Sequence, residues 1–246
     1  MKNRTILLSA IVASTAGVQA ATLATYIDGA DYADSNTPAA SSDAQITTSD
    51  MSFVGISGGF GGPVRNVFGD INVGGGVTTD YWYVVNANQD PNSDPGAGSA
   101  LTTDYYGFTV TVDAANSIDA TTLTFDWGIG SNDNALTGAT FGQRVFASVD
   151  GGAFTSVGLT SITTDVPLDT WVDQTSVTID LTSLANTADG GNIEFRIQQF
   201  TSETGGGVMA GYSNFQINGD IVATPEPSSA ALLGLGSLAL IMRRRK

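Results

Sequence analysis

The 246-residue sequence contains no cysteine and no histidine, and it has nine basic residues against twenty-four acidic ones. Without cysteine and histidine the chain cannot form a disulfide, a Ser-His-Asp triad, a thiol nucleophile or a zinc site with thiolate or imidazole ligands. A chain of this length does not need disulfides for stability, because it can bury a sizeable core. These absences exclude the commonest hydrolytic and zinc-dependent active sites.

Basic residues are scarce in the middle of the chain. Between residues 21 and 224, three arginines (Arg65, Arg144 and Arg196) stand against twenty-three acids, a formal net charge of −20. This charge repels nucleic acid and anionic lipid, so we expect no nucleic-acid partner. The acidic surface favours solubility outside the cell, with calcium binding as the alternative. We predict no cofactor and no metal ligand.

Most of the acids are aspartates that occur with Asn, Gly and Ser, and such side chains bond their own backbone in turns. The only glutamates between residues 21 and 224 are Glu194 and Glu203. Paired carboxylates could still cleave a glycosidic bond. However, Glu194 and Arg196 share one face of a predicted strand, and an ion pair explains both residues without catalysis. We therefore single out no catalytic residue.

The N-terminus has the organisation of a secretory signal peptide over residues 1–20. Lys2 and Arg4 precede an apolar stretch, Ile6–Val18, and the small side chains of Val18-Gln19-Ala20 suit signal peptidase. We expect cleavage before Ala21 and export of the rest of the chain.

The C-terminus, residues 221–246, reads as a short linker followed by a sorting tail. The tail contains Pro225-Glu226-Pro227, an apolar segment, Ala230–Met242, and a final basic run, Arg243-Arg244-Arg245-Lys246. The prolines favour an extended chain, the apolar segment can enter a bilayer as a helix, and the cations remain on the cytoplasmic side.

This tail resembles the PEP-CTERM signal of Gram-negative bacteria. The resemblance implies processing by an exosortase, a membrane-embedded enzyme. It also implies transient anchoring in the inner membrane through the C-terminal helix, and a final location at the cell surface or in the extracellular matrix.

The region between these ends, residues 21–220, has the period-two alternation of β-strands. Asp150-Gly151-Gly152 is a hairpin signal, and Phe154 begins the returning strand. Close spacing of short strands favours an all-β, antiparallel two-sheet sandwich that ends near Asp220, with a barrel as the alternative. The predicted strands are residues 105–112, 121–129, 145–149, 177–181, 193–197 and 215–217.

The same strands resemble the jelly-roll body of many PEP-CTERM proteins, which is itself similar to lectin-like and carbohydrate-binding sandwiches. The motifs that carry this resemblance are Leu123–Trp127, Val149–Gly152, Ile193–Ile197 and Asn214–Gly219. In those relatives the last strand often opens with Asp-Asn, whereas this chain has Ser213-Asn214. The missing Asp speaks against a calcium role at that strand.

Two polar loops could bind a cation. Asp90, Asn92 and Asp94 have the alternate spacing of a calcium loop, but Pro95 replaces the glycine and Leu101 the bidentate glutamate of that pattern. Residues 132–134, Asn-Asp-Asn, form a second polar group. We interpret both as ordinary loops.

The candidate glycan contacts are Trp82 and Trp171. Trp82 lies between Tyr81 and Tyr83, so a strand there would place it on the face opposite the two tyrosines. An exposed ring could stack on a sugar, whereas a buried ring would belong to the core.

Our functional prediction is a non-catalytic exported surface or matrix protein that contacts exopolysaccharide. The alternative is a secreted carboxylate-only glycoside hydrolase or lyase.

The tail should be removed or exchanged during maturation. Its thirteen apolar residues, Ala230–Met242, span ~20 Å as a helix, whereas the hydrocarbon core measures ~30 Å. Intact-mass measurement of the surface-exposed protein should therefore show loss of the arginine-rich end. Recovery of a major species that still ends in Lys246 would contradict this prediction.

Overall fold

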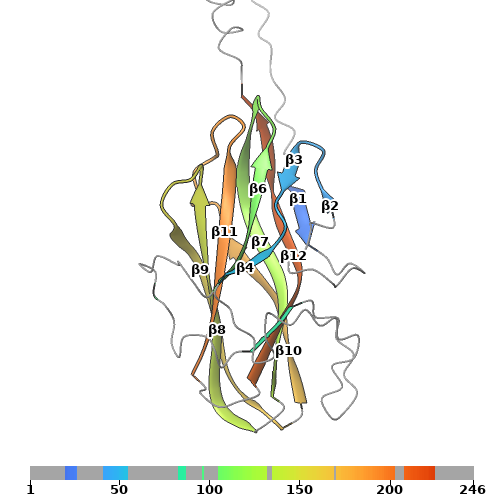
Figure 1. Ribbon diagram of the computed structural model, residues 1–246, viewed down its shortest axis with the longest axis vertical. Coiled ribbons are helices and arrows are strands. Elements are labelled where there is room, and N and C mark those ends of the chain that lie inside the picture. Colours follow the sequence, from blue (N-terminus) through green and yellow to red (C-terminus); the bar gives the residue numbers. More distant parts are fainter. Residues whose placement is uncertain are drawn as a thin grey trace, which may run out of the picture.

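The computed structural model describes residues 20–26, 41–54, 83–86, 96, 105–131, 135–168, 170–202 and 208–224. These residues form two antiparallel β-sheets and no helix (Figure 1). Sheet 1 has the order β10-β7-β12-β1-β2, with β5 also on β12; sheet 2 has the order β3-β6-β11-β8-β9, with β4 also on β6. The strands are β1 (Ala21–Tyr26), β2 (Ser41–Ser42), β3 (Ile46–Thr48), β4 (Ser52–Val54), β5 (Tyr83–Asn86), β6 (Tyr105–Val112), β7 (Asn116–Ser131), β8 (Leu136–Val149), β9 (Thr155–Val166), β10 (Thr170–Asp180), β11 (Asn192–Thr201) and β12 (Val208–Ala223).

The eight longer strands have the topology of a jelly roll. The first pairs with the last (β1 with β12), and inside this pair lie β6 with β11, β7 with β10, and the β8–β9 hairpin. Such nested pairs arise when one long antiparallel ribbon rolls up on itself. The predicted two-sheet sandwich is therefore confirmed.

The core lies between the two sheets and is built from alternate side chains of each strand. Its centre is a set of aromatic rings contributed by both sheets. Phe215 of β12 stacks on Phe125 of β7, with ring centroids 5.1 Å apart, and also contacts Phe108 of β6 at 6.4 Å. Phe108 in turn contacts Tyr26 of β1 and Phe195 of β11. These contacts fix the spacing and the relative position of the sheets.

The hairpin signal at Asp150-Gly151 produces the predicted turn. Both residues have positive φ, 52° and 71°, and the Gly152 amide donates to the Val149 carbonyl at 2.9 Å. Two consecutive positive φ values suit the twist of the flanking strands. The returning strand, β9, begins at Thr155, one residue after the predicted Phe154.

Aspartates in the described turns bind backbone groups: Asp180 binds its own turn, as predicted, whereas Asp150 binds a different segment of the chain. The Asp150 carboxylate accepts the amides of Ala188 and Asn192 at 2.6 and 2.9 Å. Asp180 accepts both the amide and the hydroxyl of Thr182, and these hydrogen bonds, the hydroxyl first, lower the pKa of Asp180. The Asp180 bonds hold the turn that follows β10, and the Asp150 bonds join the β8–β9 turn to the segment that leads into β11.

β12 continues to Ala223, beyond the expected end near Asp220. Ala223 lies opposite Asn116 of β7, and the Thr224 amide donates to the Ala115 carbonyl at 2.8 Å. Pairing with the long β7 strand continues through the residues that the sequence suggested as linker. Their side chains gave no sign of this because Val222 and Ala223 are exposed.

Several sequence predictions lie outside the described residues. These are the signal peptide, the sorting tail, Trp82, the Asp90–Asp94 loop and residues 132–134. In the part of the chain that the structure covers, no helix is long and apolar enough to cross a membrane.

Candidate surface site on sheet 2

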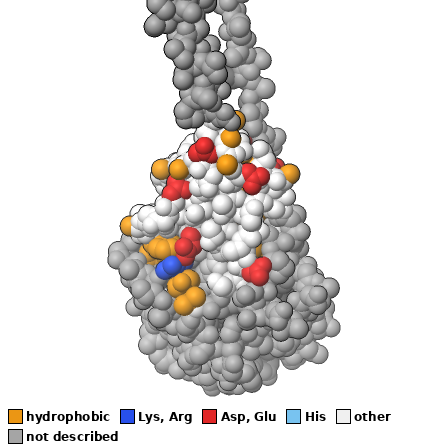
Figure 2. Space-filling model, turned by 45° about the horizontal axis from the view of Figure 1, so that its top comes forward, with side chains coloured by type: hydrophobic (Ala, Val, Ile, Leu, Met, Phe, Trp, Pro, Cys, Tyr) orange, Lys and Arg blue, Asp and Glu red, His pale blue; other side chains and the backbone are white. Residues whose placement is uncertain are grey.

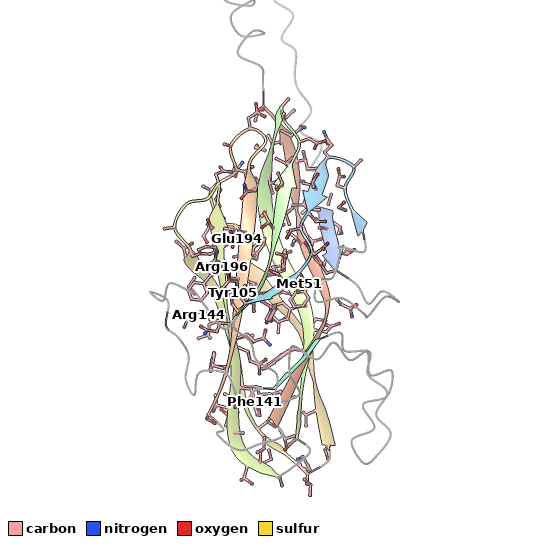
Figure 3. All side chains as sticks on the ribbon, in the orientation of Figure 1. Met51, Tyr105, Phe141, Arg144, Glu194 and Arg196 are labelled. Carbon is pink, nitrogen blue, oxygen red and sulfur yellow. The ribbon has the colours of Figure 1, made fainter. Side chains whose placement is uncertain are left out.

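The candidate site lies on the outer face of sheet 2, the face turned away from the core. Odd-numbered residues of β11, such as Ile193, Phe195 and Ile197, pack inside, so Glu194 and Arg196 project outward. Gly107 of β6 and Phe146 of β8 flank Arg196 in the strand register. Figure 3 shows Tyr105, Arg144, Glu194 and Arg196 close together on this part of the sheet.

Arg196 is held between two aromatic rings. Its guanidinium carbon lies 4.6 Å from the ring centroid of Tyr105 on β6 and 3.9 Å from that of Phe154, just before β9. We call Tyr105, Phe154, Glu194 and Arg196 the arginine cluster. Gly107, opposite Arg196, has no side chain to occupy this space. The cluster therefore joins β6, β11 and the β8–β9 hairpin across the sheet.

The Glu194 carboxylate fixes the edge of the same guanidinium. Its Oε1 atom accepts from Arg196 Nε at 2.9 Å and lies 2.8 Å from Nη2. The side chains remain partly accessible, 21% for Arg196 and 37% for Glu194. This is the i, i+2 ion pair that the sequence predicted.

A second cation borders the arginine cluster. Arg144 lies opposite Gln198, two residues along β11 from Arg196, and donates from Nη1 to the Ser156 hydroxyl at 2.9 Å. Figure 2 shows a basic side chain beside an acidic one among hydrophobic side chains, whereas the other charged side chains described in that view are acidic. Arg144 and Arg196 thus reverse the sign of charge locally in a strongly acidic body.

This arrangement combines fixed polar groups with aromatic surface. The ion pair presents a carboxylate and guanidinium N–H groups in set positions, while Tyr105 and Phe154 supply half-buried rings beside them. Preorganised polar groups next to aromatic rings suit a ligand that has both hydroxyl groups and C–H faces. No group of three or more metal-ligating side chains occurs among the described residues.

The predicted glycan contacts are not brought into the arginine cluster by any described contact. The backbone of Trp171 lies opposite Gly130 at the β10–β7 edge of sheet 1, and Trp82 is outside the described residues. Sequence reasoning did recognise Glu194 and Arg196 as a pair. It missed Tyr105 and Phe154 as their partners, although each was predicted to begin a strand.

At the Ser213-Asn214-Phe215 motif of β12, the structure shows a bulge. Asn214 has φ of 55°, the register with β7 shifts there, and its side-chain amide donates to Asp126 at 2.7 Å. Asn tolerates this left-handed conformation better than most residues. A structural role therefore accounts for Asn214.

Residues 223–246 match the model of the PEP-CTERM protein-sorting motif, in agreement with the sequence interpretation of the tail. The motif implies an exported protein with a membrane-associated sorting signal, and it supports an exosortase as processing partner. It covers only the C-terminal end, so it leaves the role of the sandwich open. Among curated protein sequences, none matches this chain.

Solved structures resemble the sandwich distantly. The K3 cleaved adhesin domain of Lys-gingipain from Porphyromonas gingivalis is 13% identical, with a TM-score of 0.34 over 71% of this chain and 92% of that one. TmCBM61 in complex with β-1,4-galactotriose is 11% identical, with a TM-score of 0.25 over 72% of this chain and 90% of that one. An aminopeptidase from the marine sediment archaeon Thaumarchaeota archaeon is 12% identical, with a TM-score of 0.38 over 83% of this chain but 37% of that one. At these values the likenesses carry no inference about ligand or activity.

The cation–π contact between Arg196 and Tyr105 should be measurable as a coupling energy. In denaturant unfolding of Arg196→Ala, Tyr105→Ala and the double variant, we expect the double-mutant cycle to give about 0.5–1 kcal/mol of favourable coupling. A matched cycle between Arg196 and Thr111, which faces the same side of β6 further along, should give none. Equal coupling in the two cycles would contradict the stacked geometry.

Proposed function

We propose that the mature protein is a non-catalytic component of the cell surface or extracellular matrix, and that it contacts exopolysaccharide through the outer face of sheet 2. The sorting motif supports export of the protein. The observation that carries the proposal is the arginine cluster, with its ion pair fixed between two aromatic rings.

The geometry of this cluster fits sugar recognition. A pyranose ring presents hydroxyl groups at its edge and C–H groups on its faces. Glu194 can accept and Arg196 can donate hydrogen bonds, and the rings of Tyr105 and Phe154 provide apolar surface beside them. Because both aromatics already pack on Arg196, little side-chain entropy is lost on binding. The face can therefore bind a glycan without rearrangement.

Binding rather than cleavage is supported by the state of Glu194. Two nitrogen atoms of Arg196 approach the same carboxylate oxygen within 2.9 Å, so the carboxylate serves as an ion-pair partner. A glycosidase needs a second carboxyl group on the other side of the scissile bond, about 5–9.5 Å from the first. Glu194 is the one carboxylate of the arginine cluster, and the neighbouring Arg144 and Gln198 add no second carboxyl group.

Affinity electrophoresis of the exported protein tests this proposal. Gels that contain the polysaccharide of the producing cells should retard the wild type, and Tyr105→Ala or Phe154→Ala should reduce the retardation several-fold. Thr111→Ala, on the same face of β6 but outside the cluster, should migrate as the wild type does. Retardation that is equal in all four proteins would place the glycan contact elsewhere.

A reducing-end assay on the same samples tests the non-catalytic part. Incubation of the exported protein with bacterial and algal polysaccharides should release no new reducing ends. Turnover that disappears in Glu194→Gln would overturn the proposal and favour a carboxylate-dependent glycan-active enzyme.

A further inference from the structure

A cleft of about 370 Å³ lies on the flank of the sandwich, between the strands that end the two sheets. β9 ends sheet 2 and β10 ends sheet 1, and within the described residues neither pairs with a further strand. Such strands present backbone N–H and C=O groups along their outer edges. The cleft is lined by the stretches 159–162 of β9 and 176–179 of β10, together with Trp127 of β7.

The strand geometry explains why the cleft forms at this place. β9 and β10 approach closely at Gly158, where an added Cβ would lie 2.7 Å from side-chain atoms of Ile179. On β10, a bulge between Gln174 and Val177 shifts the pairing with β7. The cleft lies beside this bulge and next to the point where Gly158 approaches Ile179.

The lining is uncharged and combines hydroxyl groups with an apolar base. Trp127 and Ile179 are almost fully buried, at 3% and 5% exposure, whereas Thr160, Ser161 and Thr178 are more accessible. None of the side chains that line the cleft is ionisable. The side chains that line the cleft therefore offer hydrogen bonds and contact surface, but no charged group of their own.

From this lining we infer that the cleft binds an uncharged sugar residue of a glycan chain. Hydroxyl side chains can exchange hydrogen bonds with sugar hydroxyls, and the apolar base can contact a C–H face. An anionic sugar would find no cation in the cleft and would approach a body with a formal charge of −20. The same charge opposes a second copy of the chain as occupant.

The inference goes beyond the proposed function, because the cleft is a second site with its own residues. The two sites are nevertheless neighbours: Leu159 on the cleft lies opposite Arg144, which borders the arginine cluster. A glycan chain that lies across sheet 2 can therefore reach the cleft over the β9 edge. Each site can be tested without altering the other.

Calorimetric titration of the exported protein with cellotriose, β-1,4-galactotriose and tri-galacturonate tests the inference. We expect at least one neutral trisaccharide to bind and the anionic one not to bind. The variant Thr160→Val/Ser161→Ala/Thr178→Val removes three hydroxyls with little change of shape, and each lost hydrogen bond should weaken binding about 2- to 12-fold. Thr163→Val, on β9 beyond the cleft, should bind as the wild type does.

Fluorescence of Trp127 locates the bound sugar independently. In the Trp82→Phe/Trp171→Phe background Trp127 is the remaining tryptophan, so its emission should change saturably with the same neutral trisaccharide. Absence of binding by both neutral trisaccharides, unchanged affinity in the triple variant, or equal binding of tri-galacturonate would overturn the inference. Self-association that the triple variant abolishes, without a sugar response, would instead assign the edges to protein contact. Failure of the sheet 2 proposal would leave this titration unaffected, because none of its variants alters a residue of the arginine cluster.

Discussion

Interlocked aromatic rings between the two sheets are the contact on which the rest of the structure depends. Phe215 of β12 contacts Phe125 of its own sheet and Tyr106 and Phe108 of the other, with ring centroids 5.1–6.4 Å apart. A slip of one residue in any of these strands would turn its inward side chains to solvent. The rings therefore set the strand register, and the nested pairing carries that register to the sheet edges.

The packing of this core determines which side chains project from the outer face of sheet 2. Because Phe195 and Ile197 must point inward, Glu194 and Arg196 must point outward from the same strand. The register with β6 and β8 then places Tyr105 and Phe154 on the two sides of the guanidinium. A surface site of this kind needs no separate scaffold, since the sandwich core already holds its components rigidly.

Local patterns were sufficient to predict the elements whose determinants are close in sequence. The alternation of Tyr105–Val112 gave β6 with its observed bounds, and Asp150-Gly151 gave the hairpin. The arginine cluster was not predictable in full, because Tyr105, Phe154 and Arg196 are far apart in the chain and meet only through strand register. The same holds for the cleft, which depends on where β9 and β10 fall at the sheet edges, and for the pairing that extends β12 to Ala223.

The central claim, that glycan binds at the arginine cluster, can be tested most directly by NMR of the arginine side chains. In exported protein labelled with ¹⁵N-arginine, the Arg196 signal, assigned with Arg196→Lys, should show a ring-current displacement from Tyr105 and Phe154 that is reduced in Phe154→Ala. Addition of the polysaccharide should move this signal, and the neighbouring Arg144 signal, in proportion to occupancy. Polysaccharide binding that leaves both signals unchanged would contradict the account.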